Sequence, residues 1–142
     1  MPSASPPEFF IDRSLGRRVV ANALREAGAV VHAMADVYGE RIGQELADEE
    51  WLRDAGKRGW FVLMKDAKIR YRPAELQVLI DHGLRAFCLT NANLRGVEMA
   101  ARFVDNLPRV VRVAQERRGP YIYGVYSDGV RALWPKDEPS LS

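Results

Sequence analysis

Acidic side chains stand at three places in the chain where an apolar run ends or a helix is expected to begin. Asp12 closes the run EFFID, Asp66 follows WFVLMK, and Asp48 with Glu49 opens DEEWLRDAGKRG. Carboxylates that are held close together repel one another unless a cation neutralises them. Their oxygens are also the ligands that magnesium and manganese prefer. The spacing therefore predicts a divalent metal site built from Asp12, Asp66 and Asp48 or Glu49.

Each of these carboxylates also has a purely structural explanation. Asp12 could cap the turn into the following helix, and Asp48 could be the N-cap of its own helix. Glu49 could be a first-turn charge that complements the helix dipole. Asp36, which follows AVVHAM, could add a further metal ligand or be an ordinary loop aspartate. Asp66 is the hardest to explain as a cap, because no helix start follows it closely.

Alternating hydrophobic patterns predict the elements that would position these groups. Runs with strand character alternate with segments of helical spacing, which is typical of a parallel sheet covered by helices. The expected strands are 8–12, 29–34, 60–65 and 85–90. The expected helices cover 15–28, 48–59, 73–83 and 96–118, the last interrupted near Pro108, and a hairpin is expected at 121–134. Because parallel strands end at the same edge of a sheet, this fold would gather the carboxylates on one rim.

Composition points to a single α/β domain. The chain has 142 residues, 47% of them hydrophobic, which suffices for one core. We expect the domain to span 9–134, between a disordered leader at 1–8 and a flexible tail at 135–142. Cys88 lies in an apolar run and is expected to be a buried hydrophobe without a disulfide partner. The sequence has neither a signal peptide nor a long apolar segment, which predicts a cytoplasmic protein.

Other familiar chemistries find no support in these residues. The sequence contains neither the P-loop pattern nor the GxGxxG dinucleotide pattern. One cysteine and two histidines cannot supply a zinc site in any standard spacing. His32 lies in an apolar strand and is expected to be a partly buried core residue, and His82 is expected to close a helix. No nucleophilic triad is therefore predicted.

The order of the acidic motifs resembles the PIN-like nuclease family, and within it the VapC-type toxins of bacterial toxin–antitoxin pairs. FFID is followed by GRR, then VVHAM, then ADEEWLRDAGKRGWFVLMKDAKI, so Asp12, Asp48 with Glu49, and Asp66 occupy the family's acidic positions. The resemblance is strongest over residues 8–70. It implies a three-layer α/β sandwich and a metal-dependent endoribonuclease, in which these residues bind magnesium or manganese and activate water. It also implies a cognate antitoxin protein as a partner.

The resemblance is looser over residues 84–135, where the chain departs from the family pattern. A further acidic residue is common in the family after the later strand, whereas this sequence continues LTNANLRG. Thr90, Asn91 and Asn93 could bind a metal-bound water or a phosphate, but amides carry no charge. Asp36 could supply the missing charge, so the number of metal ions stays open.

An RNA substrate would need cations beside the acidic residues. The candidates, which lie at strand ends or in the turns that follow, are Arg13, Arg17, Lys65, Lys68, Arg70 and Arg72. Surface cations are often simply solvated, so either role is open for them. Tyr71 could stack on an unpaired base or pack in its own turn.

Three functions of different kinds are compatible with these residues. The first is the metal-dependent ribonuclease toxin. The second is a receiver-like phosphoacceptor domain, whose first strand should end in an acidic pair, whereas Asp12 is followed by Arg13. The third is a catalytically silent interaction domain whose carboxylates serve as caps. The apolar segment 97–114 could form a homodimer or antitoxin interface, or could simply pack on the sheet.

Overall fold

The structure is a computed structural model and describes residues 6–136. Its strands are β1 (Glu8–Ile11), β2 (Val30–Ala33), β3 (Phe61–Met64), β4 (Arg85–Leu89), β5 (Tyr121–Tyr126) and β6 (Gly129–Trp134). Its α-helices are α1 (Val19–Glu26), α2 (Met34–Tyr38), α3 (Glu40–Glu45), α4 (Asp48–Arg58), α5 (Pro73–Asp81), α6 (Gly96–Asp105) and α7 (Leu107–Glu116). Two short 3₁₀ turns, η1 (Arg13–Leu15) and η2 (Lys68–Tyr71), follow β1 and β3.

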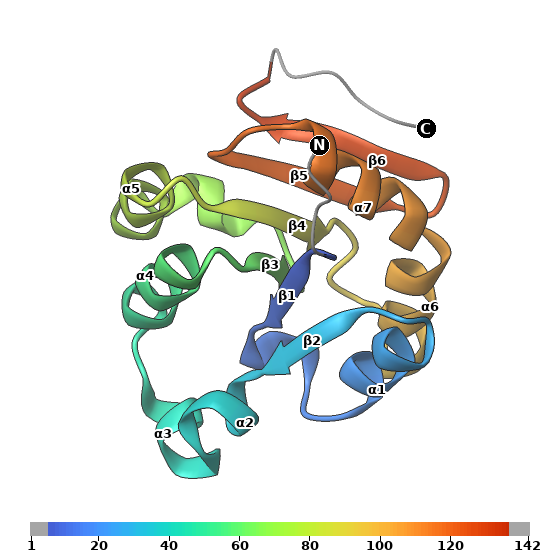
Figure 1. Cartoon of the computed structure of the whole chain (residues 1–142), viewed down its shortest axis with the longest axis horizontal. Coiled ribbons are helices and arrows are strands. Elements are labelled where there is room, and N and C mark those ends of the chain that lie inside the picture. Colours follow the sequence, from blue (N-terminus) through green and yellow to red (C-terminus); the bar gives the residue numbers. More distant parts are fainter. Residues whose placement is uncertain (1–5, 137–142) are drawn as a thin grey trace.

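One six-stranded sheet carries the fold, in the order β2-β1-β3-β4-β5-β6. All neighbouring strands are parallel except β5 and β6, which form the antiparallel C-terminal hairpin. Figure 1 shows α1, α6 and α7 on one side of the sheet and α4 and α5 on the other. The expected α/β sandwich with a mainly parallel sheet and a terminal hairpin is therefore confirmed.

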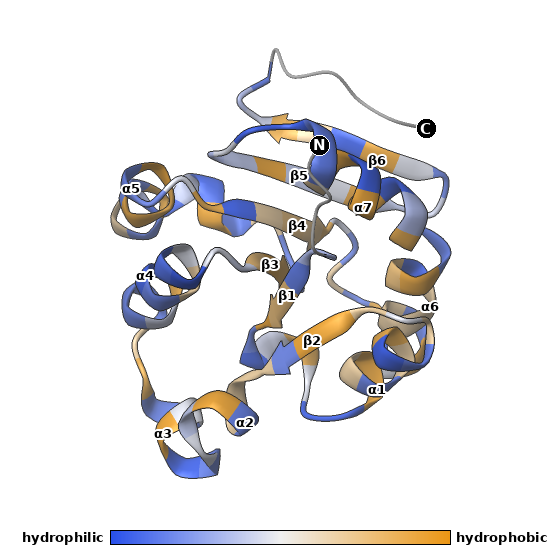
Figure 2. Ribbon diagram, in the orientation of Figure 1, coloured by the Kyte–Doolittle hydropathy of each residue, from blue (hydrophilic) through white to orange (hydrophobic). Residues whose placement is uncertain are grey.

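Alternating strand residues build a core on each face of the sheet. Phe9 and Ile11 of β1 pack in the cluster that includes side chains of α1, α6 and α7. Phe10, between them, packs in the cluster on the opposite face with Trp51 of α4. Figure 2 shows hydrophobic and hydrophilic residues alternating along α7, as expected of a helix with one buried face. Cys88 of β4 is fully buried with a free thiol, as predicted.

Helix ends follow the residues that the sequence singles out. Helix α4 stops at Gly59, whose φ of 74° lies in the left-handed region that glycine adopts without a β-carbon clash. Helix α5 begins at Pro73 and ends before His82. Helices α6 and α7 meet at Asn106, as expected because Pro108 has no backbone N–H with which to continue the preceding helix.

Several local expectations are wrong. Asp48 is not an N-cap, because Ala47 holds that position and Asp48 is the first helical residue. Leu15 belongs to η1 and not to α1, because Gly16 takes a φ of 81° and breaks the helical path. Glu8, which fell both in the expected leader 1–8 and in the expected strand 8–12, is the first residue of β1, so the strand assignment is the correct one. The strand expected at 29–34 ends at Ala33, because Met34 begins α2, and no element was expected for the rest of α2 or for α3.

The apolar segment 97–114 packs largely against the sheet. Met99, Phe103, Val110 and Val113 are buried in the core, whereas Val97 is 73% exposed. Most of the segment therefore packs in the core. A homodimer or antitoxin interface at its exposed residues stays a prediction.

The chain ends fall partly outside the described residues. Residues 1–5 of the expected leader and 137–142 of the expected tail are not described. Within 6–136, no helix combines the length and apolar character needed to cross a membrane.

Candidate active site

Three carboxylates lie at the edge of the sheet where β1, β3 and β4 end, and we call Asp12, Asp48 and Asp66 the acidic rim. Asp12 follows β1, Asp66 follows β3 by two residues, and Asp48 opens α4. Two pKa shifts show which of these groups are close enough to interact. The pKa of the Cys88 thiol in β4 is raised by burial and then by the charges of Asp12 and Asp66. The pKa of Asp12 is raised mainly by burial, and the charge of Asp48 raises it further. Because such effects weaken with distance, Asp12 lies near Asp48, and both Asp12 and Asp66 lie near Cys88.

Asp12 is the most enclosed member of the acidic rim, with 8% of its surface exposed. Burial raises its pKa from 3.8 to about 6, against the lowering effect of hydrogen bonds from Ser14. Ser14 donates its backbone N–H, at 3.1 Å, and its hydroxyl to Oδ1 of Asp12. The backbone N–H of Lys65 donates to that same hydroxyl oxygen at 3.2 Å, which ties the end of β1 to the end of β3. Asp12 also caps η1, so a capping role and a chemical role are compatible in one residue.

Asp48 is held by two side-chain donors. Its Oδ1 accepts a hydrogen bond from Nη2 of Arg13 at 3.0 Å and another from the indole Nε1 of Trp51 at 2.9 Å. The indole is fully buried, whereas the Asp48 side chain is 38% exposed. Asp48 is therefore fixed both to the core and to the residue that follows Asp12.

Asp66 is held by the turn that follows it. Its Oδ1 accepts a hydrogen bond from the backbone N–H of Lys68 at 2.9 Å. In all three carboxylates of the acidic rim, the hydrogen bonds end on Oδ1, and Oδ2 accepts none from residues 6–136. Metal-binding carboxylates are commonly hydrogen-bonded in this way, because outer donors orient the oxygen that binds the ion.

Glu49 and Glu75 lie where α4 packs against α5. Burial, and then the charge of Asp48, raise the pKa of Glu75, with a smaller contribution from Glu49. Oε1 of Glu75 is buried without a hydrogen-bond partner among the described residues, and Arg72 lies 3.7 Å from it. Nothing in the sequence singles out Glu75, since a glutamate in the first turn of a helix is ordinary. The hydrogen bonds from Ser14 to Asp12 were not predicted either, although the position of Ser14 two residues after Asp12 offered a signal.

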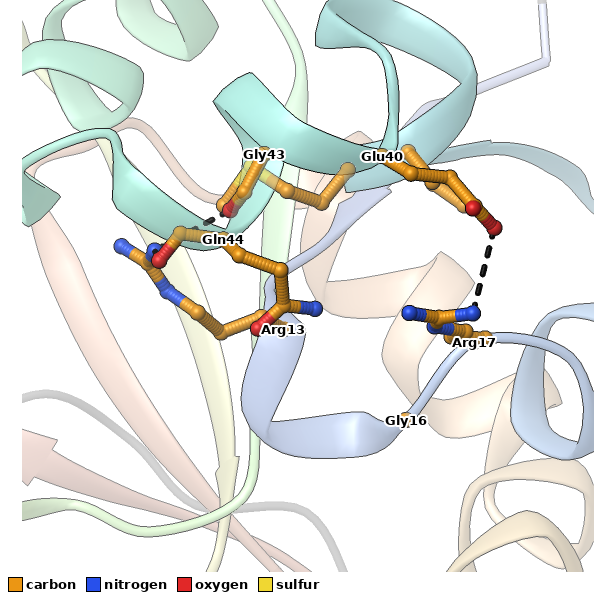
Figure 3. Close-up of a pocket in the computed structure, with 9 residues that line it drawn as sticks. Arg13, Gly16, Arg17, Glu40, Gly43 and Gln44 are labelled. Carbon is orange, nitrogen blue, oxygen red and sulfur yellow. Dashed lines mark hydrogen bonds and ion pairs between the residues drawn. The ribbon is translucent and has the colours of Figure 1, made fainter.

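Asp36 and Arg17 form surface ion pairs on other elements. Asp36 of α2 lies 3.3 Å from Nη2 of Arg25 and its side chain is 66% exposed. Arg17 lies 3.1 Å from Oε1 of Glu40, the contact drawn in Figure 3. Neither ion pair involves the acidic rim, so a metal role for Asp36 and a phosphate role for Arg17 remain predictions.

The basic residues after β3 remain close to the acidic rim. Lys68 is exposed and Lys65 is half-buried. The Arg70 guanidinium lies 4.8 Å from the centre of the Tyr71 ring. Burial, and then the charges of Asp12 and Asp66, raise the pKa of Cys88, whereas the charge of Arg70 lowers it. Arg70 therefore lies near Cys88, as Asp12 and Asp66 do, and Tyr71 is 72% exposed.

Asn91 and Asn93 form the turn after β4. Oδ1 of Asn91 accepts a hydrogen bond from the backbone N–H of Asn93 at 2.9 Å, and both residues are exposed. This contact explains the pair as turn residues. Their contact with a metal-bound water or a phosphate stays a prediction.

The donor chemistry of the acidic rim fits a hydrated divalent ion. No three side chains of His, Cys, Asp or Glu within 6–136 lie close enough together to hold an ion by themselves. Magnesium, however, usually keeps several waters and is bound through one or two carboxylates. The interacting pair of Asp12 and Asp48, each with one oxygen left unbonded by the protein, meets that requirement.

Comparisons with known proteins agree with this architecture. A family model described as a PIN like domain matches residues 7–91, which contain the whole acidic rim. A protein of Mycobacterium tuberculosis named "Putative ribonuclease VapC45" is 37% identical over 126 residues, which cover 88% of this chain and 91% of that protein. No solved structure matches the chain. Since the family match covers more than half of the sequence and includes β1 to β4, the chain belongs to the family of PIN-like domains.

Proposed function

We propose that the protein is a metal-dependent endoribonuclease that hydrolyses RNA phosphodiester bonds with magnesium or manganese. The observation that best supports the proposal is the acidic rim, in which the chain's own donors hold Oδ1 of each carboxylate and leave Oδ2 unbonded. The similarity to a relative named as a ribonuclease supports the same class of reaction.

The carboxylates of the acidic rim and the basic residues beside them would have different roles in such a reaction. A bound divalent ion would lower the pKa of a water and orient the scissile phosphate. Asp12 and Asp48 would hold the ion through their Oδ2 atoms, with Asp66 as the third carboxylate. Lys68 and Arg70, in the turn after Asp66, would bind the flanking phosphates.

Metal dependence is the direct test of the proposal. Purified protein is incubated with a mixed RNA pool and magnesium, manganese or chelator, beside an Asp66→Asn variant prepared in the same way. We expect cleavage with either metal, none with chelator, and a rate at least about tenfold lower for the variant, because a charged ligand is lost. The variant should keep its melting temperature, which separates a chemical role from a structural one.

The alternative is a catalytically silent interaction domain, and the observation that favours it is the capping of η1 by Asp12. The same experiment separates the two interpretations. If wild type and Asp66→Asn are equally inert and manganese changes neither melting temperature, the result would support the silent domain and contradict the nuclease.

Tyr71 provides a prediction about the form of the RNA. Its exposed ring on η2 is positioned to stack on an unpaired base. Stacking of this kind contributes about 1–3 kcal/mol per base, so Tyr71→Ala should raise KM for single-stranded RNA by roughly tenfold with kcat unchanged. Tyr71→Phe keeps the aromatic face and should behave as wild type. Equal KM values for the alanine variant and wild type would show that the ring does not contact substrate.

The partner is part of the same proposal. Because the relative carries a VapC name, we propose that this chain is the toxin of a type II toxin–antitoxin pair, acting in the cytoplasm and inhibited by a cognate antitoxin. Co-expression with the product of a neighbouring gene, followed by co-purification and loss of RNA cleavage, tests this step. Whether the chain also forms a homodimer is measured in the same preparation by light scattering.

A further inference from the structure

Arg13 makes an unusually complete set of contacts inside the protein. Its Nη1 donates to the carbonyl oxygens of Gly43, at 3.0 Å, and Gln44, at 2.6 Å. Its Nη2 donates to the carbonyl oxygen of Leu46 and, at 3.0 Å, to Oδ1 of Asp48. Figure 3 shows the Arg13 side chain directed at Gly43 and Gln44.

These contacts leave Arg13 poorly suited to the phosphate-binding role that its position suggests. A guanidinium has five N–H donors, and four of those of Arg13 are used by the protein. Arginine recognises phosphate best through two parallel donors, and only the Nε N–H remains. The side chain is also largely enclosed, at 26% exposure.

The acceptors of Arg13 lie at the end of α3 and in the short connection to α4. The last carbonyls of a helix have no partner within the helix and favour a cation. Only Leu46 and Ala47 separate α3 from α4, so one guanidinium closes α3 and also fixes the entry to Asp48. Because Arg13 directly follows Asp12, these bonds set the position of Asp48 relative to Asp12.

We propose that Arg13 is a positioning residue that fixes the Asp48 carboxylate, with Oδ2 available, beside Asp12 for a divalent ion. The inference rests on the proposed function. Without Arg13, the partly exposed Asp48 would keep only the indole of Trp51 as a donor. A positive charge so close to the site opposes the binding of another cation, so the geometric and electrostatic effects of Arg13 have opposite signs.

Substitutions at Arg13 separate those two effects. Arg13→Lys keeps the charge, but its single nitrogen cannot reach all four acceptors. We expect it to weaken Mn²⁺ binding, measured by electron paramagnetic resonance without RNA, by about tenfold or more, the usual range for an outer donor to a ligand. Arg13→Gln removes the charge, so a purely electrostatic role predicts tighter Mn²⁺ binding and a positioning role predicts weaker binding.

Arg131→Lys is the matched control. Arg131 also pairs with an aspartate, Asp128 at 2.9 Å, but in the β5–β6 hairpin, so its replacement should leave Mn²⁺ affinity within about twofold of wild type. The double variant with Asp48→Asn tests the route of the effect. If Arg13 acts through Asp48, Arg13→Lys should change Mn²⁺ affinity no further in the Asp48→Asn background.

The outcomes distinguish this inference from the proposed function. Wild type that binds Mn²⁺, together with an Arg13→Lys variant that binds it as tightly, overturns the role of Arg13 alone. A raised KM for RNA at unchanged Mn²⁺ affinity, or independent effects of Arg13→Lys and Asp48→Asn, also overturns it. Wild type that neither binds Mn²⁺ nor cleaves RNA overturns the proposed function, and with it the inference.

Discussion

Replacing Asp12 with asparagine is expected to lower RNA cleavage by at least about two orders of magnitude. Asparagine has the same shape and its Oδ1 can still accept the hydrogen bonds from Ser14, but it loses the negative charge. A divalent ion contributes several kcal/mol to transition-state stabilisation, and each 1.4 kcal/mol corresponds to about tenfold in rate. Asp12 is the most buried carboxylate of the acidic rim, so water can replace its charge least well.

The same substitution should make the metal-free protein more stable at neutral pH. Burial raises the pKa of Asp12 to about 6 from 3.8, so the folded state binds this proton more tightly than the unfolded state. The resulting stabilisation is fully present below about pH 4 and is lost as the pH rises through about 6. At pH 7 the free energy of unfolding of wild type is therefore about 3 kcal/mol lower than it would be with Asp12 protonated. Asparagine carries no titrating proton, so Asp12→Asn does not lose this stability.

Urea unfolding from pH 4 to 7.5 in the presence of chelator measures this difference. The free energy of unfolding of Asp12→Asn, relative to wild type, should rise over the interval between about pH 4 and pH 6. Added manganese should then stabilise wild type and leave the variant unchanged. A variant that cleaves RNA normally, or that follows wild type at every pH, would contradict the assignment of Asp12.

Replacing Trp51 with alanine is expected to lower the free energy of unfolding by about 3–5 kcal/mol, the usual range for removing a buried large aromatic ring. Trp51 is fully buried in the core on the α4 side of the sheet, and its ring centre lies 5.5 Å from that of Phe10. Alanine would leave a cavity there and remove the indole donor to Asp48. Since a domain of this kind has about 5–15 kcal/mol of stability in total, the change is severe.

Urea unfolding followed by circular dichroism measures the effect of Trp51→Ala. Val97→Ala, a change at a residue of α6 that is 73% exposed, should alter the free energy of unfolding by no more than about 0.5 kcal/mol. Equal stability of the two variants would show that the Trp51 ring does not fill the core.

Hydrophobic periodicity was sufficient to predict most of the elements and their layers. Runs such as WFVLMK are apolar on both faces, and that pattern is typical of a strand covered by helices on both sides. Gly59 and Pro73 marked helix ends because their backbone preferences act locally. Helices α2 and α3 were missed because each is shorter than two turns, which leaves too little periodicity to detect.

The site was predicted less completely than the fold. The sequence places Asp12 and Asp66 at strand ends, and parallel strands bring such residues to one edge. It offers two roles for Asp48, and the structure excludes the N-cap role by placing Ala47 in that position. Glu75 comes beside Asp48 only because α5 packs against α4.

The sequence by itself determined which residue types were available, the order of the strands and the longer helices along the chain, and the PIN-like character of the acidic motifs. These properties depend on neighbours in the chain, so they can be recognised locally. Only the tertiary structure decided the partners of the long side chains. Arg13 looked like a phosphate ligand in the sequence, and it contacts residues about thirty positions away because the end of α3 returns to β1. The pKa of Asp12 also depends on the structure, since burial, its largest cause, arises only when the two helical layers close over the sheet.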